Sequence, residues 1–300
     1  MSTSELDVKL DKFRLVKQMH LPNDIKSIIV LKNGALAIGT YGTVFIYKKD
    51  NIFKPDITIK IQDSANSLLE LPDGSLVAGA KGLFIWTFNE NFDQAKLKGT
   101  IKSDNDIDTV LLLPDERLVF SFTYASNLLF FKSTAPYSDT PIHKIETQCN
   151  SRLTYIKERN ELLAYDYYDN SLCSWNASNY QLVKTIKLEA TIYSTLTVVD
   201  RNTLAYGHCK EIFSIDLDTG TVEKLFESEN IEGTNGKNGL MLRDGHTMLV
   251  SGDHLCCYDF KSKTYQQRTY NRGANLNIIM KLDNRNIMNV CNRHIEWWRY

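Results

Sequence analysis

The chain has 300 residues, of which 43% are hydrophobic and 24% are charged, and its net charge is −1. A chain this close to neutral is not a general binder of nucleic acid or of acidic membranes, because those partners are held by a surplus of Lys and Arg. The apolar content is enough to bury a core, which excludes wholesale disorder, and the length suits one large domain or two average ones.

The beginning of the chain, Met1 to Lys9, is polar and has no apolar stretch of signal-peptide length. No run of 18 apolar residues occurs, so no membrane-spanning helix is expected. We therefore expect a cytoplasmic protein. We also expect its cysteines to be free, reduced thiols rather than a disulfide framework. They are Cys149, Cys173, Cys209, Cys256, Cys257 and Cys291.

A polar turn between two short apolar runs recurs seven times along the chain, at intervals of about 42 residues. Asn-Gly and Asp-Gly supply the positive φ that a two-residue hairpin turn needs, so each turn is expected to join two strands. The turns are 32–34, 72–74, 114–116, 158–160, 200–202, 243–245 and 283–285.

Two more strands are expected in each repeat. A third apolar run closes on a large residue, and a fourth segment alternates apolar and polar positions, as in 181–186, which suits an outer strand with one wet face. The closing residues of the third runs are Tyr47, Trp86, Phe131, Trp175, Ile215, Tyr258 and Trp298.

Four strands in a repeat of this length are typical of a β-propeller. The seventh repeat ends after its third strand, and the segment 13–19 has the pattern of the missing outer strand. We therefore expect an all-β, seven-bladed propeller of four-stranded antiparallel blades over residues 13–300, in which the N-terminal strand closes the last blade. Residues 1–12 are expected to form a short tail. Two separate β-sandwiches, the alternative, would show no single period and no missing strand.

The repeats resemble divergent WD40 repeats over about residues 13–300. The segment 71–79, Leu-Pro-Asp-Gly-Ser-Leu-Val-Ala-Gly, is similar to the centre of such repeats, and 217–220 matches the turn that follows their third strand. The pairs Trp175-Asn176, Ile215-Asp216 and Tyr258-Asp259 stand where that family has Trp-Asp. Trp-Asp itself does not occur, and no Gly-His precedes a first strand. The resemblance implies a WD40-like fold.

One set of polar residues marks the expected mouth of the central channel. Each lies eight residues before its turn, where the innermost strand of its blade begins. One explanation of their polarity is that water fills the mouth of such a channel. Alternatively, the three cations among them favour an acidic or phosphorylated peptide. The channel-mouth residues are Lys26, Asn66, Asp108, Arg152, Ser194, Lys237 and Asn277.

A second set lies in the loops between second and third strands, which we call the loop rim. Tyrosine is enriched at protein interfaces because it buries a large area with few torsions and keeps a polar tip. The densest cluster is Asp-Tyr-Tyr-Asp-Asn at 166–170, which could equally lie flat on its own blade. The rim residues are Tyr41, Tyr124, Tyr167, Tyr168, Lys210, His254 and Arg293.

Enzyme motifs are absent from the sequence: it contains no Gly-x-Ser-x-Gly, Walker loop or dinucleotide fingerprint. Cys291 and His294 have a metal-like spacing, and His254 and Cys256 alternate on one strand, but neither pair has a partner pair, so no metal or cofactor is expected. We expect a non-catalytic interaction scaffold that binds a protein or peptide, acidic or phosphorylated, as a monomeric fold within a larger complex. The alternative is a propeller enzyme or small-ligand binder that uses the channel.

Overall fold

The computed structural model describes residues 13–49, 53–123, 127–147, 151–192, 196–208, 211–227, 239–242, 245–251, 254–269, 277–282, 286–291 and 293–299. Every regular element in these ranges is a β-strand, and none of them contains a helix that could cross a membrane. The chain forms two compact units, Asn23–Ile186 and Met1–Pro22 with Lys187–Tyr300. Only the backbone is described for Ser151, Arg152, Gly239, Ser251, His254, Leu255, Gln267, Arg268, Thr269, Asn277 and Cys291.

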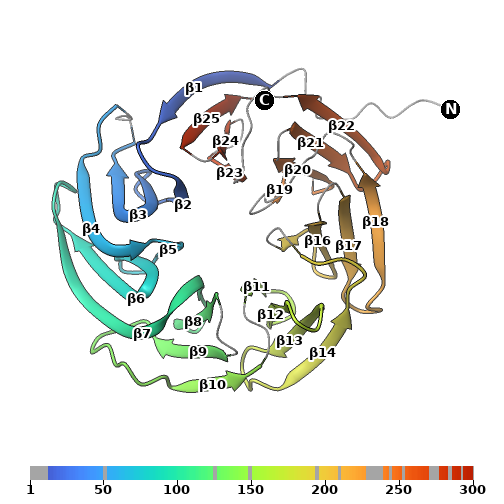
Figure 1. Cartoon of the computed structure of the whole chain (residues 1–300), viewed down its shortest axis with the longest axis horizontal. Coiled ribbons are helices and arrows are strands. Elements are labelled where there is room, and N and C mark those ends of the chain that lie inside the picture. The colour runs from blue at the N-terminus through green and yellow to red at the C-terminus, as the bar shows by residue number, and fades with distance from the viewer. Residues whose placement is uncertain are drawn as a thin grey trace. The chain divides into compact units, whose positions relative to one another are not determined.

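The unit Asn23–Ile186 is built from thirteen strands in three antiparallel sheets (Figure 1). Their orders are β2-β3-β4, β10-β9-β8-β7-β6-β5 and β11-β12-β13-β14. The strands are β2 (Ile25–Val30), β3 (Leu36–Tyr47), β4 (Ile57–Ser64), β5 (Ser67–Glu70), β6 (Leu76–Phe88), β7 (Ala95–Leu112), β8 (Arg117–Phe122), β9 (Asn127–Lys132), β10 (His143–Glu146), β11 (Ser151–Ile156), β12 (Glu161–Asp166), β13 (Ser171–Asn176) and β14 (Leu182–Lys187).

The other unit contains twelve strands in three sheets of four, with the orders β15-β16-β17-β18, β19-β20-β21-β22 and β1-β25-β24-β23. The N-terminal strand β1 pairs with the last strand β25, so the prediction that segment 13–19 completes the last sheet is confirmed. The strands are β1 (Arg14–His20), β15 (Thr197–Val198), β16 (Thr203–His208), β17 (Glu211–Asp216), β18 (Val222–Glu227), β19 (Gly239–Met241), β20 (Thr247–Ser251), β21 (His254–Asp259), β22 (Thr264–Thr269), β23 (Asn277–Lys281), β24 (Asn286–Cys291) and β25 (His294–Arg299).

Consecutive sheets of each unit pack against one another, the arrangement of blades in a β-propeller. In the unit Asn23–Ile186, β2 contacts β5 of the next sheet, and β7 contacts β11 of the next sheet as well as β5 within its own six-stranded sheet. In the other unit, β15 contacts β19 and β19 contacts β23. Both units are therefore all-β and propeller-like, as the sequence predicts.

The sheets differ from the predicted set of seven separate four-stranded blades: five have at least four strands and one has three. The strand β7 accounts for the six-stranded sheet, because it runs without interruption from Ala95 to Leu112 and pairs with both β6 and β8. The strand β3 accounts for the three-stranded sheet, because one long strand stands where the sequence predicts two.

The two ends of β3 lie close together. A Cβ atom placed on Gly34, before the strand, would lie 3.1 Å from Cδ of Lys49, after the strand. A straight strand would separate these positions by about 50 Å. The chain therefore reverses direction within β3, at Tyr41 and Gly42, where Gly42 has φ +72° and Oγ1 of Thr40 donates to the carbonyl of Thr43 at 3.0 Å.

The turns after β2 and β5 are three-residue loops, and not the two-residue turns predicted, whereas the turn after β11 has four residues, 157–160, because Ile156 pairs with Glu161. After β2, the amide of Leu31 donates to the carbonyl of Ala35, and the amide of Gly34 donates back to Leu31. Only the last residue of such a loop needs a positive φ, and Gly34 and Gly74 have φ values of +84° and +81°. The same two hydrogen bonds recur after β5, where the amide of Leu71 donates to the carbonyl of Ser75 and the amide of Gly74 donates to the carbonyl of Leu71.

Two glycines allow neighbouring segments to approach closely, Gly39 beside the residues between β4 and β5, and Gly79 beside β7 of the same six-stranded sheet. A Cβ atom on Gly39 in β3 would lie 2.6 Å from the backbone oxygen of Ala65, and one on Gly79 in β6 would lie 2.8 Å from Cγ2 of Ile107. Apolar side chains fill the remaining space between the sheets. Between the sheet of β8 and the sheet of β11–β14, for example, Phe130 and Trp175 belong to one buried cluster.

Candidate interaction surface

Two exposed tyrosines lie on the turn between β12 and β13, residues Asp166–Asn170, which we call the tyrosine turn. Tyr167 is 56% exposed and Tyr168 is 72% exposed. Their rings meet edge to face, with centroids 6.0 Å apart. The structure therefore presents the densest predicted rim cluster to solvent.

The backbone of the tyrosine turn is held by its own buried residues. Oδ1 of Asp166, a buried side chain, accepts hydrogen bonds from the amides of Tyr168 and Asp169 at 2.9 and 3.0 Å. The hydroxyl of the buried Tyr165 donates to Oδ1 of Asn170 at 2.8 Å. Asn170 has φ +47°, a conformation that asparagine tolerates better than most residues. The turn therefore holds its two tyrosines on a fixed backbone.

Tyr41, a third rim residue, is 63% exposed at the reversal of β3. Tyr265 on β22, which is 47% exposed, differs from these side chains because its ring stacks on Phe226 with centroids 5.0 Å apart. A tyrosine that lies flat on a neighbouring ring offers only one face to a partner. Tyr265 is therefore a natural comparison for the tyrosine turn.

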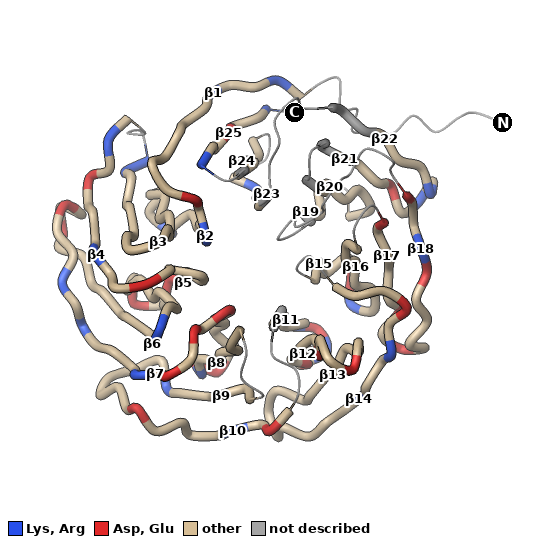
Figure 2. Tube along the Cα trace, in the orientation of Figure 1, with Lys and Arg blue, Asp and Glu red and all other residues tan. Residues whose placement is uncertain are grey.

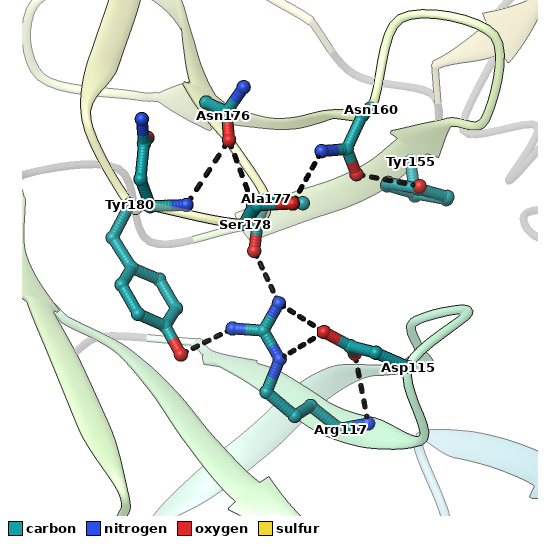
Figure 3. Close-up of polar contacts among 9 residues, drawn as sticks. Asp115, Arg117, Tyr155, Asn160, Asn176, Ala177, Ser178 and Tyr180 are labelled. Atoms are coloured by element: carbon teal, nitrogen blue, oxygen red, sulfur yellow. Dashed lines mark hydrogen bonds and ion pairs between the residues drawn. The ribbon is translucent and has the colours of Figure 1, made fainter.

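The opposite end of the β11–β14 sheet receives an arginine from the preceding sheet (Figure 3). Arg117, the first residue of β8, has only 14% of its side chain exposed. Its guanidinium donates to the hydroxyl of Tyr180 and to the carbonyl of Ala177, both in the turn between β13 and β14. Nε also donates to Oδ2 of Asp115 at 2.7 Å. We call Asp115, Arg117, Ala177 and Tyr180 the arginine clamp.

Aromatic rings surround the arginine clamp. The Arg117 guanidinium lies 4.9 Å from the ring centroid of Tyr180 and 5.8 Å from that of Phe130, within the range of cation–π attraction. His143 of β10 stacks on the other side of the cluster, with its ring 3.6 Å from that of Tyr180. The hydrogen bond from Arg117 lowers the pKa of Asp115, against the opposing effect of burial.

Further polar side chains support the turns at this end of the sheet. The hydroxyl of Tyr155 donates to Oδ1 of Asn160 at 3.0 Å, and Nδ2 of Asn160 donates to Oγ of Ser178 at 2.8 Å, so the two turns of this end are joined (Figure 3). A lysine bridges the two preceding sheets in a similar way, because Nζ of Lys32 donates to the carbonyl of Leu71 at 3.2 Å. At this end, the cationic side chains of Lys32 and Arg117 therefore each join two neighbouring sheets.

Three channel-mouth residues have described side chains, and all three are half-buried: Lys26, Asn66 and Asp108. Nδ2 of Asn66 donates to the carbonyl of Ile107 at 3.2 Å, which joins the start of β5 to β7 of the same sheet. Oδ2 of Asp108 accepts a hydrogen bond from Oγ1 of Thr109 at 3.1 Å. Asn66 therefore has a structural role that the sequence did not indicate.

For the remaining predicted site residues, the structure gives only the exposure of the side chain, only the position of the backbone, or neither. Arg293 of the loop rim is exposed. The backbones of Arg152, Asn277 and His254 lie in β11, β23 and β21, and their side chains are not described. Four predicted residues lie outside the described ranges: Tyr124, Ser194, Lys210 and Lys237.

Charge is locally organised along β7 of the unit Asn23–Ile186. Lys96, Lys98 and Lys102 occupy its first half, and Asp104, Asp106 and Asp108 occupy its second half, a change of sign that Figure 2 shows. Lys98 forms an ion pair with Asp73 at 2.5 Å. A chain of net charge −1 thus still carries local patches of either sign.

The described residues contain no group of three or more His, Cys, Asp or Glu side chains that could hold a metal ion. Cys173, Cys256 and Cys257 form no disulfide bond. Burial raises the pKa of Cys256 to about 12, so this thiol stays protonated and unreactive near neutral pH.

Sequence reasoning missed the arginine clamp, although one signal was present. Arg117 directly follows a predicted turn, at a position where earlier repeats have Ala35 and Ser75. A large cation at a position that is otherwise small indicates that its side chain reaches a partner elsewhere.

In comparisons with known proteins, the chain matches no protein-family model and no curated protein.

Proposed function

We propose that this chain is a WD40-like, seven-bladed propeller that acts as a non-catalytic, cytoplasmic scaffold and binds a partner protein through the tyrosine turn. The observation that carries the proposal is the exposure of Tyr167 and Tyr168, 56% and 72%, on a backbone held by buried residues. A fixed backbone lowers the entropy lost on binding, and two tyrosines supply the contact area of a hot spot.

Two features support the seven-bladed reading. The reversal of β3 at Tyr41 and Gly42 gives its sheet the equivalent of a fourth strand. Likewise, β7 is long enough to serve as the outer strand of one blade and the first strand of the next, since it pairs with β6 through residues 95–106 and with β8 through residues 107–112. Counted in this way, the sheets correspond to seven repeats.

The aspartates that follow the third strands support the WD40-like reading. Asp259, which is buried, accepts hydrogen bonds from the amides of Lys261 and Ser262 at 2.7 and 3.0 Å and lies 3.3 Å from Nδ1 of His246. Asp216 accepts a hydrogen bond from the amide of Thr219 at 2.7 Å. Each aspartate thereby shapes the turn into the outer strand of its sheet.

The test is quantitative affinity capture with the full chain and its Tyr167→Ala/Tyr168→Ala double variant, using lysate of the source cells and mass spectrometry. We expect the double variant to keep the wild-type melting temperature, because neither ring is buried, and to lose the captured partner. Tyr265→Ala is the matched control and should capture normally. Undiminished capture by the double variant would refute the tyrosine turn as the binding surface.

A second variant tests the acidic or phosphorylated partner that the channel-mouth cations favour. If the partner is a phosphopeptide bound by these cations, Arg152→Ala should abolish capture, and phosphatase treatment of the lysate should do the same. Normal capture in both cases would exclude this class of partner and leave the tyrosine turn as the proposed site.

A further inference from the structure

Two histidines face each other where the N-terminal strand meets the last strand of the chain. His20 is the last residue of β1, His294 is the first residue of β25, and the two form a directly opposed pair in the antiparallel register. Their Nδ1 atoms lie 3.4 Å apart and their ring centroids 4.5 Å apart, with the rings tilted by 53°.

The separation of the two nitrogens suits metal coordination better than a hydrogen bond. Hydrogen bonds from N–H groups have heavy-atom distances of about 2.7–3.2 Å, which is shorter than the 3.4 Å between these atoms. Two imidazole nitrogens bound to one tetrahedral zinc at about 2.0–2.1 Å would lie about 3.4 Å apart.

The surroundings of the pair allow a hydrated cation. His20 is exposed and His294 is half-buried, so water can complete the coordination. Strand alternation places Glu296 on the same face of β25 as His294, and this buried carboxylate adds negative charge nearby. Arg293 is adjacent to His294 along the chain, and its positive charge would repel a bound cation. Because Arg293 is exposed, solvent screens this repulsion.

We propose that His20 and His294 form a binding site for a divalent transition metal such as Zn²⁺, with water at the open positions. Imidazole is a preferred ligand of Zn, Cu and Ni and a poor one for Mg and Ca. The two histidines come from different strands, β1 and β25, which are paired with each other. A bound ion would fasten β1 to β25.

The proposal is tested by following thermal unfolding of the full chain during titration with ZnCl₂, with MgCl₂ as the control ion. A site that binds only the folded state lowers the unfolding constant about 100-fold when free Zn²⁺ is 100 times its Kd. We expect a saturable rise in melting temperature with Zn²⁺ and none with Mg²⁺. His20→Ala and His294→Ala should each abolish the rise, and His143→Ala should keep it.

Two results would overturn the site: no rise for the wild-type chain at millimolar Zn²⁺, or an equal rise in both histidine variants. His20→Gln guards against a folding defect, since it keeps a polar side chain in β1 and should still lose the response. Titration with Co²⁺ then defines the ligands. The visible spectrum of Co²⁺ should change on binding to the wild-type chain and should stay that of the free aqueous ion with His20→Ala or His294→Ala.

Discussion

The two ends of the β11–β14 sheet use their polar side chains in opposite ways. At one end, the side chain of Arg117 is only 14% exposed, and its guanidinium donates within the protein to Asp115, Ala177 and Tyr180. At the other end, the carboxylate of Asp166 holds the backbone of the tyrosine turn, while Tyr167 and Tyr168 project into solvent.

This difference separates residues that hold the sheets together from residues that are available to a partner. A side chain whose hydrogen bonds and faces are already occupied gains little from a new contact. An exposed aromatic on a fixed turn loses little entropy and gains buried area when it is covered. Substitutions at the clamp should therefore change stability, and substitutions of the exposed tyrosines should change binding.

Arg117→Ala should give the largest loss of stability. It removes charge-assisted hydrogen bonds to Tyr180 and Asp115 and leaves the carbonyl of Ala177, a buried residue, without its guanidinium partner. We expect the free energy of unfolding to fall by about 2–3 kcal/mol, measured by urea denaturation. Arg117→Lys should recover only part of this, because an ammonium lacks the planar fork.

The control for Arg117→Ala is Lys144→Ala. Lys144 pairs with Glu146 at 3.1 Å, but both side chains are largely exposed, so its loss should cost less than about 1 kcal/mol. If the two variants lose the same stability, the clamp is no stronger than a surface ion pair.

Asp166→Ala should have the next largest effect. It removes the acceptor for the amides of Tyr168 and Asp169, so the turn loses the interaction that holds its backbone. We expect a loss of about 1–2 kcal/mol, together with faster hydrogen exchange of these two amides. Unchanged exchange would show that the turn is held by other contacts.

Much of the fold could be predicted from the sequence because it depends on local pattern. The interval between turns and the alternation of the outer strands predicted the small antiparallel sheets, and the apolar pattern of 13–19 predicted the pairing of β1 with β25. The turn type was predicted wrongly, because Asn-Gly and Asp-Gly occur in both two-residue and three-residue loops. The uninterrupted course of β7 has no sequence signal, since its middle is polar and turn-like.

The site was predictable only where exposure follows from loop position. Tyr167 and Tyr168 stand in a short polar segment between strands, and the structure exposes both. Arg117 could not be assigned its role, because Tyr180 lies 63 positions away and the contact depends on how two sheets pack. The role of Asn66 could not be predicted for a similar reason, since its partner Ile107 lies 41 positions away along the chain.

Tyr165→Phe should have a smaller effect than Asp166→Ala. The ring of Tyr165 stays buried in the variant, and the hydrogen bond from its hydroxyl to Asn170 is lost. We expect a loss of about 1 kcal/mol by urea denaturation, and partner capture weakened less than in the Tyr167→Ala/Tyr168→Ala variant. A complete loss of capture would mean that the hydrogen bond, and not the exposed rings, defines the surface.

The smallest expected effect is the acid dependence of the arginine clamp. The pKa of Asp115 is lowered in the folded protein, chiefly by its hydrogen bond from Arg117. The carboxylate therefore contributes stability above the ordinary aspartate pKa of about 3.9, and this contribution is lost as the pH falls through the folded-state value. The unfolding free energies of the wild-type chain and Asp115→Asn should differ at pH 7, and the difference should shrink as the pH falls below about 3.9. Glu146→Gln, from the exposed pair with Lys144, is the control and should differ from the wild type less at pH 7. A difference for Asp115→Asn that does not shrink as the pH falls would show that the carboxylate acts through packing rather than through its charge.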